Sequence, residues 1–259
     1  TLNMIKVIEI RLNTNDINNQ KLIFKNISEK LNINQSRINN IILSKKSIDS
    51  RNKKIKYQLR YKVFIDSSFY KHSSVIRNYI NVNNKKTVVI IGFGTAGLFA
   101  ALRLIELGIK PIIFERGKKI RERRRDIANL NKKHILNNDS NYCFGEGGAG
   151  TFSDGKLYTR SKKRGDINRI LETLVYHGAD KIILIEAHPH IGTDKLPKII
   201  KKMRETILNC GGEIHFNSRI SDIITKENKI YKIKINEEKE IKSKNIILAT
   251  GHSARDIYY

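Results

Sequence analysis

Cysteines and long apolar runs are scarce in this chain of 259 residues. Its 2 cysteines, Cys143 and Cys210, lie far apart and form no Cys-x-x-Cys pair, so a reducing compartment is the natural one. No stretch approaches the ~20 apolar residues that a membrane span needs, and no signal-peptide pattern precedes the first expected strand. We therefore expect a cytoplasmic protein with no membrane partner. Thr1-Leu2-Asn3 precede Met4, which makes Met4 a candidate for the natural start.

Acidic residues are also few, since 25 Asp and Glu stand against 50 Lys and Arg, which gives a formal net charge of +25. Such a charge is compatible with nucleic-acid binding. The basic residues are spread along the whole chain, however, beside frequent Ile and Asn, and the codons of Lys, Ile and Asn are all A/T-rich. A nucleic-acid reader concentrates its charge and interleaves aromatic residues. We attribute the charge mainly to a biased genome and do not expect a nucleic-acid partner.

Residues 1–84 are expected to comprise a small α+β domain of order βαββ and, over residues 73–84, a polar linker. The predicted strand, helix and two further strands lie at residues 5–10, 17–31, 38–48 and 55–65. Alternation in the last strand places Tyr57 and Tyr61 on its apolar side, with solvated basic residues behind. We favour packing in the domain core for these tyrosines, and the alternative is a platform for stacking RNA bases.

A glycine-rich turn between a strand and a helix is the most informative motif of the chain. Residues 87–91 are a β-branched run typical of a buried parallel strand, and an apolar helix over residues 98–107 follows the turn. In Gly92-Phe93-Gly94-Thr95-Ala96-Gly97, the first glycine permits the tight turn and the second lets a pyrophosphate approach the backbone. The third lets helix and strand pack closely. The amides at the helix N-terminus favour phosphate groups.

A second strand, residues 111–114, delivers Glu115 at the position expected of an acid that binds ribose hydroxyls. Because strand, glycine turn, helix, second strand and acid are in register, residues 87–115 predict a dinucleotide-binding unit. Arg116-Gly117 and a basic helix over residues 120–130 follow. One arginine of this helix could reach a cofactor phosphate, whereas we expect a solvated helix face for the rest.

A second glycine cluster, residues 143–155, is denser than the first. Glycines cost backbone entropy on ordering, so their density makes sense where a backbone lies against a flat ligand or a pyrophosphate. A flexible surface loop is the alternative, but Phe144 and Phe152 are unusual in a solvated linker. We favour a loop that faces the ligand. For Cys143, beside this loop, we favour a structural role over a redox role, because no resolving cysteine lies nearby.

A histidine-rich segment follows a helix expected at residues 166–177 and a short strand expected at 181–185. His188, His190 and Asp194 suggest a metal, but no further ligand set at suitable spacing accompanies them, so we expect none. His188 and His190 are the candidates for a proton-handling, catalytic role beside a cofactor. Loop structure is the interpretation that we favour for them. An amphipathic helix then runs to Cys210.

The remaining pattern predicts an α/β fold with a Rossmann-like parallel sheet. The expected parallel strands are residues 87–91, 112–114, 213–216 and 245–249. We expect the first of these to lie centrally, between residues 112–114 and 213–216. Short alternating segments over residues 220–241 predict a β-meander. Thr250-Gly251 follows the last strand and would let the backbone pass under a dinucleotide.

Several of these motifs together resemble a known family. The segments that carry the resemblance are residues 90–98, 114–117, 144–156, 187–192 and 248–256. They look like the uncharacterised bacterial FAD-dependent, or NAD(FAD)-utilising, dehydrogenases, which are similar in fold to the glutathione-reductase superfamily of flavoproteins. The resemblance implies FAD as the bound dinucleotide, with its ADP half at the first glycine turn. The expected cofactor contacts are Gly92, Gly94, Thr95, Ala96, Gly97, Glu115, Arg116, Gly147, Gly148, Ala149, Gly150, Thr151, Thr250 and Gly251.

Two departures from the family pattern matter. Thr95 replaces the proline usual in this turn, and both residues suit a helix start. The chain also stops at Tyr259, whereas family members continue for about as long again. We therefore expect residues 85–259 to be a truncated FAD-binding domain, with the start of a substrate domain over about 151–212.

The leading functional hypothesis is a flavoprotein oxidoreductase that needs its missing half, which a separate chain could supply. We expect the fragment alone not to hold FAD stoichiometrically. No second Gly-x-Gly-x-x-Gly motif is present, so NAD(P)H would visit the flavin only transiently as a reductant. The alternatives are a non-catalytic remnant of such an enzyme and a basic RNA-binding protein.

Overall fold

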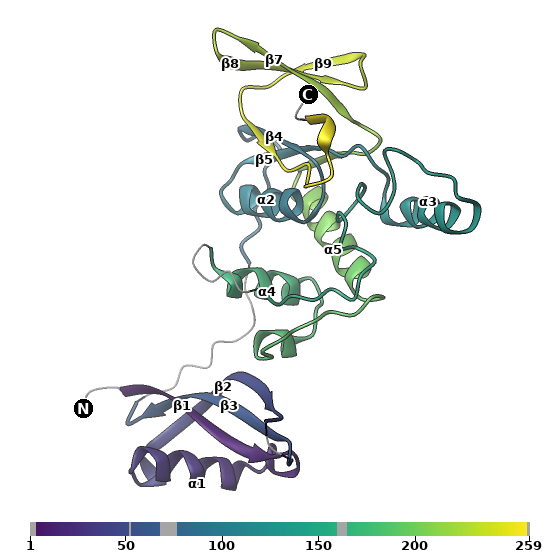
Figure 1. The fold of residues 1–259 in the computed structure, drawn as a ribbon. Helices are drawn as coiled ribbons and strands as arrows, with labels where there is room; N and C mark the ends of the chain where they lie inside the picture. Colours follow the sequence, from purple (N-terminus) through teal and green to yellow (C-terminus); the bar gives the residue numbers. More distant parts are fainter. Residues whose placement is uncertain (1–3, 52, 68–76, 160–164, 258–259) are drawn as a thin grey trace. The chain divides into compact units, whose positions relative to one another are not determined.

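The computed structural model describes residues 4–51, 53–67, 77–159 and 165–257 (Figure 1). The chain forms two compact units. The first comprises Thr1–Val75, Lys156–Val175 and Asp180–Ile191, and the second comprises Ile76–Gly155, Tyr176–Ala179 and Gly192–Tyr259. Much of the segment that the sequence analysis assigns to the start of a substrate domain thus belongs to the first unit.

The N-terminal part of the first unit is a three-stranded antiparallel sheet with one helix. Its elements are β1 (Met4–Asn13), η1 (Thr14–Asp16), α1 (Gln20–Leu31), η2 (Gln35–Arg37), β2 (Ile38–Asp49) and β3 (Lys56–Ile65). The sheet order is β1-β3-β2, and α1 begins where the Asn19 side chain accepts a hydrogen bond from the Leu22 amide. The predicted βαββ order is confirmed. At the outer edge of β2, Lys46 exchanges backbone hydrogen bonds with Ile185 and Ala187.

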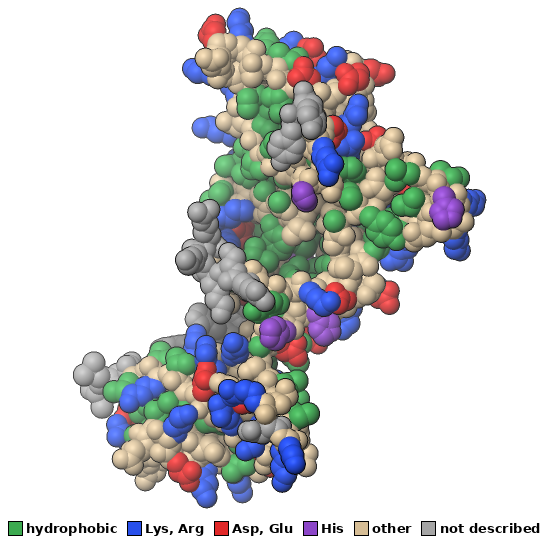
Figure 2. Space-filling view, viewed as in Figure 1, with side chains coloured by type: hydrophobic (Ala, Val, Ile, Leu, Met, Phe, Trp, Pro, Cys, Tyr) green, Lys and Arg blue, Asp and Glu red, His purple; other side chains and the backbone are tan. Residues whose placement is uncertain are grey.

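The two tyrosines of β3 belong to the core of this sheet. Tyr61 is 5% exposed among buried residues such as Ile27 and Val63, and Tyr57 packs against the same cluster. The core interpretation is therefore confirmed, and a base-stacking platform that includes Tyr61 is wrong. Lys and Arg side chains occur all over the visible face in Figure 2 and are not gathered on one element.

The second unit is built on the predicted strand–helix–strand unit. Its elements are β4 (Thr87–Ile91), α2 (Thr95–Glu106) and β5 (Lys110–Phe114), and the two strands pair in parallel. Ile90 is fully buried on the side of α2. Val89 and Ile91 pack on the opposite side of the sheet, as the period of a strand requires. Both faces of β4 are thus buried, which explains its continuous apolar run.

The order of the parallel sheet differs from the predicted one. It is β10-β4-β5-β6, where β6 is Glu213–His215 and β10 is Ile246–Leu248. The prediction that residues 213–216 pair beside β4 is wrong, because β6 pairs with β5 and β10 occupies the other edge of β4. Helix α5 (Leu196–Asn209) contacts α2, so both helices cover one face. Two crossovers carry the chain from β4 to β5 and from β5 to β6, and each pair of strands is parallel.

The predicted β-meander is confirmed and covers the other face of the parallel sheet (Figure 1). Its strands are β7 (Ile220–Lys226), β8 (Lys229–Ile235) and β9 (Lys239–Lys242), in the order β7-β8-β9. Ile220, Ile233 and Ile235 share a buried cluster with Val89 and Phe114 of the parallel strands. The second unit therefore has three layers, with helices, a parallel sheet and an antiparallel sheet.

The remaining elements are helical. They are α3 (Ile120–Lys133), α4 (Ile167–Tyr176), η3 (Lys181–Leu184) and η4 (Arg255–Ile257). The prediction of a strand at residues 181–185 is wrong, because the Asp180 side chain accepts a hydrogen bond from the Ile182 amide and starts a 3-10 turn instead. Within the described ranges, no helix combines the length and the apolar character that crossing a membrane requires.

Candidate functional site

A cavity of about 440 Å³ opens in the second unit, where β4, β5 and β10 end. Ligands of open parallel α/β sheets bind outside the carboxyl ends of the strands, and this volume is typical of a cofactor site. Five segments of the sequence, within residues 91–96, 114–116, 143–150, 218–220 and 249–257, form the lining. The predicted contacts among the lining residues are Gly92, Gly94, Thr95, Ala96, Glu115, Arg116, Gly148, Ala149, Gly150, Thr250 and Gly251.

The first glycine turn brings the start of α2 to this cavity. Gly92 has a φ of 101°, and a Cβ there would lie 2.5 Å from the carbonyl oxygen of Ala249. A Cβ at Gly97 would collide with the carbonyl oxygen of Gly92, so Gly97 allows the helix to pack and does not line the cavity. Gly94 is the N-cap of α2 and provides no side-chain cap. The Thr95 amide belongs to the backbone bridge between Gly94 and Gly147, whereas the Ala96 amide, within the part of the chain that the structure describes, remains available to an anionic ligand.

Glu115 is buried at the cavity wall and binds three backbone amides. Its Oε2 accepts a hydrogen bond from Phe93 (2.6 Å), and its Oε1 accepts hydrogen bonds from Gly117 (2.8 Å) and Gly145 (3.0 Å). The side chain thus joins the first glycine turn to the end of β5 and to the glycine-rich loop. A carboxylate accepts about four hydrogen bonds, so one acceptor position remains for a ligand. The sequence pattern predicted the ribose contact but not this structural role.

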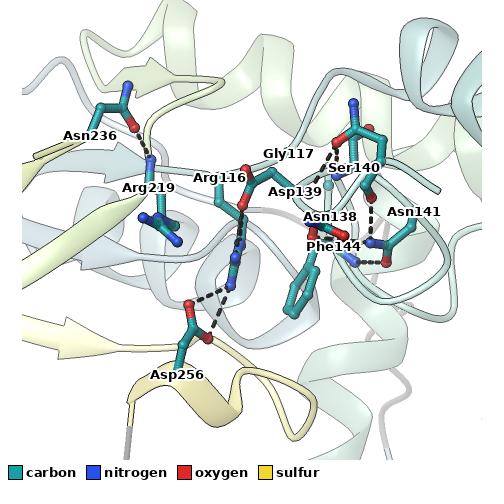
Figure 3. Close-up of polar contacts among 12 residues, drawn as sticks. Arg116, Gly117, Asn138, Asp139, Ser140, Asn141, Phe144, Arg219, Asn236 and Asp256 are labelled. Carbon is teal, nitrogen blue, oxygen red and sulfur yellow. Dashed lines mark hydrogen bonds and ion pairs between the residues drawn. The ribbon is translucent and has the colours of Figure 1, made fainter. Parts of the chain in front are cut away.

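Arg116 lines the cavity, but two aspartates already engage its guanidinium group. Its Nε donates to Asp139 (2.8 Å), and its Nη1 donates to both carboxylate oxygens of Asp256 (2.9 and 3.1 Å). Figure 3 shows Arg116 reaching both aspartates, with Phe144 beside it, and the guanidinium carbon lies 4.3 Å from the centre of that ring. The Arg116 charge is therefore largely compensated within the protein.

The glycine-rich loop lies against the first glycine turn. The Gly147 amide donates to the carbonyl oxygen of Phe93 (2.8 Å), which holds Gly148 next to Gly94. Gly147 and Thr151, both predicted contacts, do not line the cavity. Thr151 is fully buried, and its hydroxyl group bonds to the carbonyl oxygen of Gly148 (2.8 Å) within the loop. The loop contributes its backbone at residues 148–150 to the site.

Two buried charged residues that the sequence does not predict lie behind this loop. Arg123 of α3 and Glu146 of the loop are both 0% exposed. Burial lowers the pKa of Arg123 to about 10, against the opposing effect of Glu115, and burial raises the pKa of Glu146. Arg123 falls four residues before Ile127, on the apolar stripe of the helix. That spacing is the signal that could have distinguished it from the solvated arginines beside it.

The candidate catalytic histidines belong to the first unit and do not line the cavity, which the second unit forms. The His188 ring lies 4.5 Å from the ring of Tyr158, and His190 pairs with Lys156 as an isolated backbone bridge. Both contacts are structural and local, as expected of a loop. Among the residues that the structure describes, no three His, Cys, Asp or Glu side chains are arranged to hold a metal ion.

Comparison with known proteins gives a family match for the N-terminal domain. Residues 4–64 match a domain of unknown function, DUF8436. An uncharacterised protein of Clostridium beijerinckii is 38% identical over 269 aligned residues, which cover 98% of this chain and 50% of the relative. This chain thus spans half the length of that relative.

Proteins with a described activity are similar over shorter or more divergent regions. A dual trans-enoyl reductase/FAD-dependent monooxygenase of Aspergillus terreus is 50% identical over 42 residues, 16% of this chain and 6% of that protein. Among solved structures, the match to THI4 of Thermovibrio ammonificans covers 65% of this chain and 58% of that chain, with 17% identity and a TM-score of 0.42. Thioredoxin reductase of Lactococcus lactis covers 64% and 36%, with 19% identity and a TM-score of 0.35.

Proposed function

We propose that the second unit binds FAD and that the protein is a flavin-dependent oxidoreductase acting on a small molecule. The observation that carries the proposal is the meeting, at one cavity, of the first glycine turn, the start of α2 and Glu115. This combination suits the ADP half of a dinucleotide, because it offers amides to phosphates and a carboxylate to ribose hydroxyls. The name of the Aspergillus terreus protein, which includes an FAD-dependent monooxygenase, supports the same cofactor.

The residues of the cavity would bind and orient the cofactor. The Ala96 amide at the start of α2 would hold a pyrophosphate oxygen, and the remaining acceptor position of Glu115 would bind the adenosine ribose. The backbone at residues 148–150 and at Thr250-Gly251 would follow the cofactor along the cavity. The flavin supplies the redox chemistry when it is bound. NAD(P)H is the proposed transient reductant.

We further propose that redox activity requires the region corresponding to the other half of the Clostridium relative, in the same chain or in a separate one. The alternative is a non-catalytic flavoprotein remnant. Activity assays with and without that region distinguish the two, because a remnant stays inactive in both. The cavity itself belongs to one compact unit, so nucleotide binding can be tested in the chain described here.

Substitution of Ala96 provides the test of the binding site. Ala96 is exposed at the first turn of α2, so Ala96→Asp leaves the core intact, and an acid at this position favours the helix. The same carboxylate repels a phosphate. We expect the dissociation constant for ADP, measured by calorimetry, to rise at least about tenfold, with no loss of thermal stability.

Ala128→Asp is the matched control, since Ala128 is exposed on α3 and does not line the cavity. It makes the same change in charge and is expected to leave ADP and FAD binding unchanged. The proposal fails if the unmodified chain binds neither ADP nor FAD, or if Ala96→Asp binds both as tightly as the unmodified chain.

A further inference from the structure

Arg123 is a fully buried cation whose hydrogen bonds nearly all go to one segment of the chain. Its Nε donates to the carbonyl oxygen of Asn141 (2.9 Å), and its Nη2 donates to that of Tyr142 (3.1 Å). Its Nη1 donates to the carbonyl oxygen of Glu146 (2.8 Å) and to the hydroxyl oxygen of Thr151 (3.1 Å). One side chain of α3 thus gathers the polar groups of residues 141–151 around itself.

The surroundings of Arg123 compensate for the cost of burying its charge. Glu115 and Glu146 are the buried carboxylates that act on it, and each is fixed by other groups. Glu146 accepts hydrogen bonds from the Ile120 amide (2.9 Å) and from Arg204 of α5 (2.8 and 2.9 Å). A buried charge with this many partners stabilises one particular arrangement of them, and leaving those partners unpaired is costly.

The shape of the guanidinium group matters as well as its charge. Its donors form a planar fork that reaches several acceptors at once, whereas the ammonium group of lysine is a compact point charge. Gly145 packs so closely against the Arg123 side chain that a Cβ there would collide with Cδ. The loop and the side chain are therefore fitted to each other.

Two amides of the loop have no hydrogen-bond partner among the residues that the structure describes. The carbonyl groups of Asn141, Tyr142 and Glu146 accept hydrogen bonds from Arg123. The amides of Gly145 and Gly147 bind Glu115 and the Phe93 carbonyl oxygen. The amides of Ala149 and Gly150 make no hydrogen bond to any part of the chain that the structure describes, and both residues line the cavity. The neighbouring Gly148 lies against Gly94, the residue directly before α2.

We propose that Arg123 is a positioning residue, which holds the loop so that the Ala149 and Gly150 amides bind the cofactor pyrophosphate together with the start of α2. This inference rests on the proposed FAD site and adds a second set of phosphate donors to it. Arg123 itself does not touch the ligand. Its effect on affinity should therefore depend on how many phosphates the ligand carries.

The test uses Arg123→Lys, which keeps the charge and removes the fork, with Arg125→Lys as the matched control, because Arg125 is exposed on the same helix. Dissociation constants for AMP, ADP and FAD are measured by calorimetry, together with amide hydrogen exchange of residues 143–155 and the thermal midpoint. In Arg123→Lys we expect ADP and FAD to bind about tenfold more weakly, as for the loss of a charge-assisted hydrogen bond. AMP should lose much less, and exchange of the loop should increase.

The outcomes separate this inference from the proposed function. If the unmodified chain binds ADP and FAD while Arg123→Lys weakens AMP and ADP equally or neither, the positioning role is overturned and the FAD site stands. If the unmodified chain binds no nucleotide, the proposed function and the pyrophosphate role both fail. In that case faster loop exchange in Arg123→Lys, but not in Arg125→Lys, would retain Arg123 only as an anchor of the loop.

Discussion

The cavity has two glycine-rich walls that differ in what keeps them in place. The first turn, residues 92–97, lies between a buried strand and a helix, and backbone atoms pack directly on backbone atoms there. The second wall, residues 143–155, contains no helix or strand and is held by the side chains of Glu115, Arg123 and Thr151. Glycine content alone therefore does not reveal how a loop is ordered.

The largest effect is expected at Gly97 in the first wall. Gly97→Ala places a Cβ against the carbonyl oxygen of Gly92, and a backbone obstacle cannot rotate away. We expect a loss of roughly 3 kcal/mol in the free energy of unfolding, measured with urea. Gly150→Ala in the second wall is the control, because the nearest atom to its Cβ is 4.0 Å away. Equal stability losses in the two variants would remove the distinction between the walls.

Glu115→Gln is expected to have the next largest effect, because Glu115 joins both walls. The amide group of glutamine presents an N–H where the carboxylate accepts hydrogen bonds from Phe93, Gly117 and Gly145. One buried donor would then face another, at a cost of about 2 kcal/mol in the free energy of unfolding. Glu122→Gln, at an exposed position of α3, should change stability little. A stable Glu115→Gln with only weaker nucleotide binding would mean that the ribose contact outweighs the structural one.

The two walls also differ in how much of their structure can be predicted from the sequence. The first wall is predicted nearly completely, since β4, the turn, α2, β5 and Glu115 are contiguous and each leaves a local pattern. The second wall is predicted only as a loop that faces the ligand. Its anchors are partners across the fold, and the spacing of Arg123 from Ile127 indicates a buried side chain but does not show which loop groups that side chain binds.

The order of the strands in the parallel sheet is also set by contacts that local sequence patterns do not show. A strand is predicted at residues 213–216, after the turn at Gly211-Gly212, but no local pattern shows that it pairs with β5 while β10 takes the free edge of β4. The turn at Asp180 is a smaller case, because one side-chain hydrogen bond replaces a predicted strand by η3.

The second wall should also respond to pH through Glu146. Burial raises the pKa of this carboxyl group, against the opposing effects of the Ile120 amide and Arg204. The folded protein therefore binds the proton of Glu146 more tightly than the unfolded chain does. The resulting contribution to the free energy of unfolding is present below the unfolded pKa of about 4.3, and it is lost as the pH rises through the pKa of Glu146 in the folded protein. Glu146→Gln, which cannot ionise, should lack this loss. Its urea midpoint should fall less than that of the unmodified chain as the pH rises from about 4 to 7, and parallel curves would contradict the assignment.

The smallest effect is expected at Cys143, where the second wall begins. The sequence favours a structural role for Cys143, but this residue is exposed and lines the cavity. Its side chain does not anchor the loop, so Cys143→Ser should change the free energy of unfolding by about 0.5 kcal/mol or less. The dissociation constant for FAD, measured by calorimetry, should equal that of the unmodified chain. Loss of FAD from this variant would assign the thiol a direct contact with the cofactor.

The pairing of β10 with β4 has a consequence for the order of events on the ribosome. β4 is synthesised early in the second unit, but the strand that completes its free edge emerges only after the whole meander. Contacts between residues so distant in sequence form late, and an unpaired strand edge invites association with other chains. Thr250 and Gly251 follow β10 directly and line the cavity. The nascent chain therefore cannot close its nucleotide site, or gain protection from a bound cofactor, until residues 246–251 have left the exit tunnel.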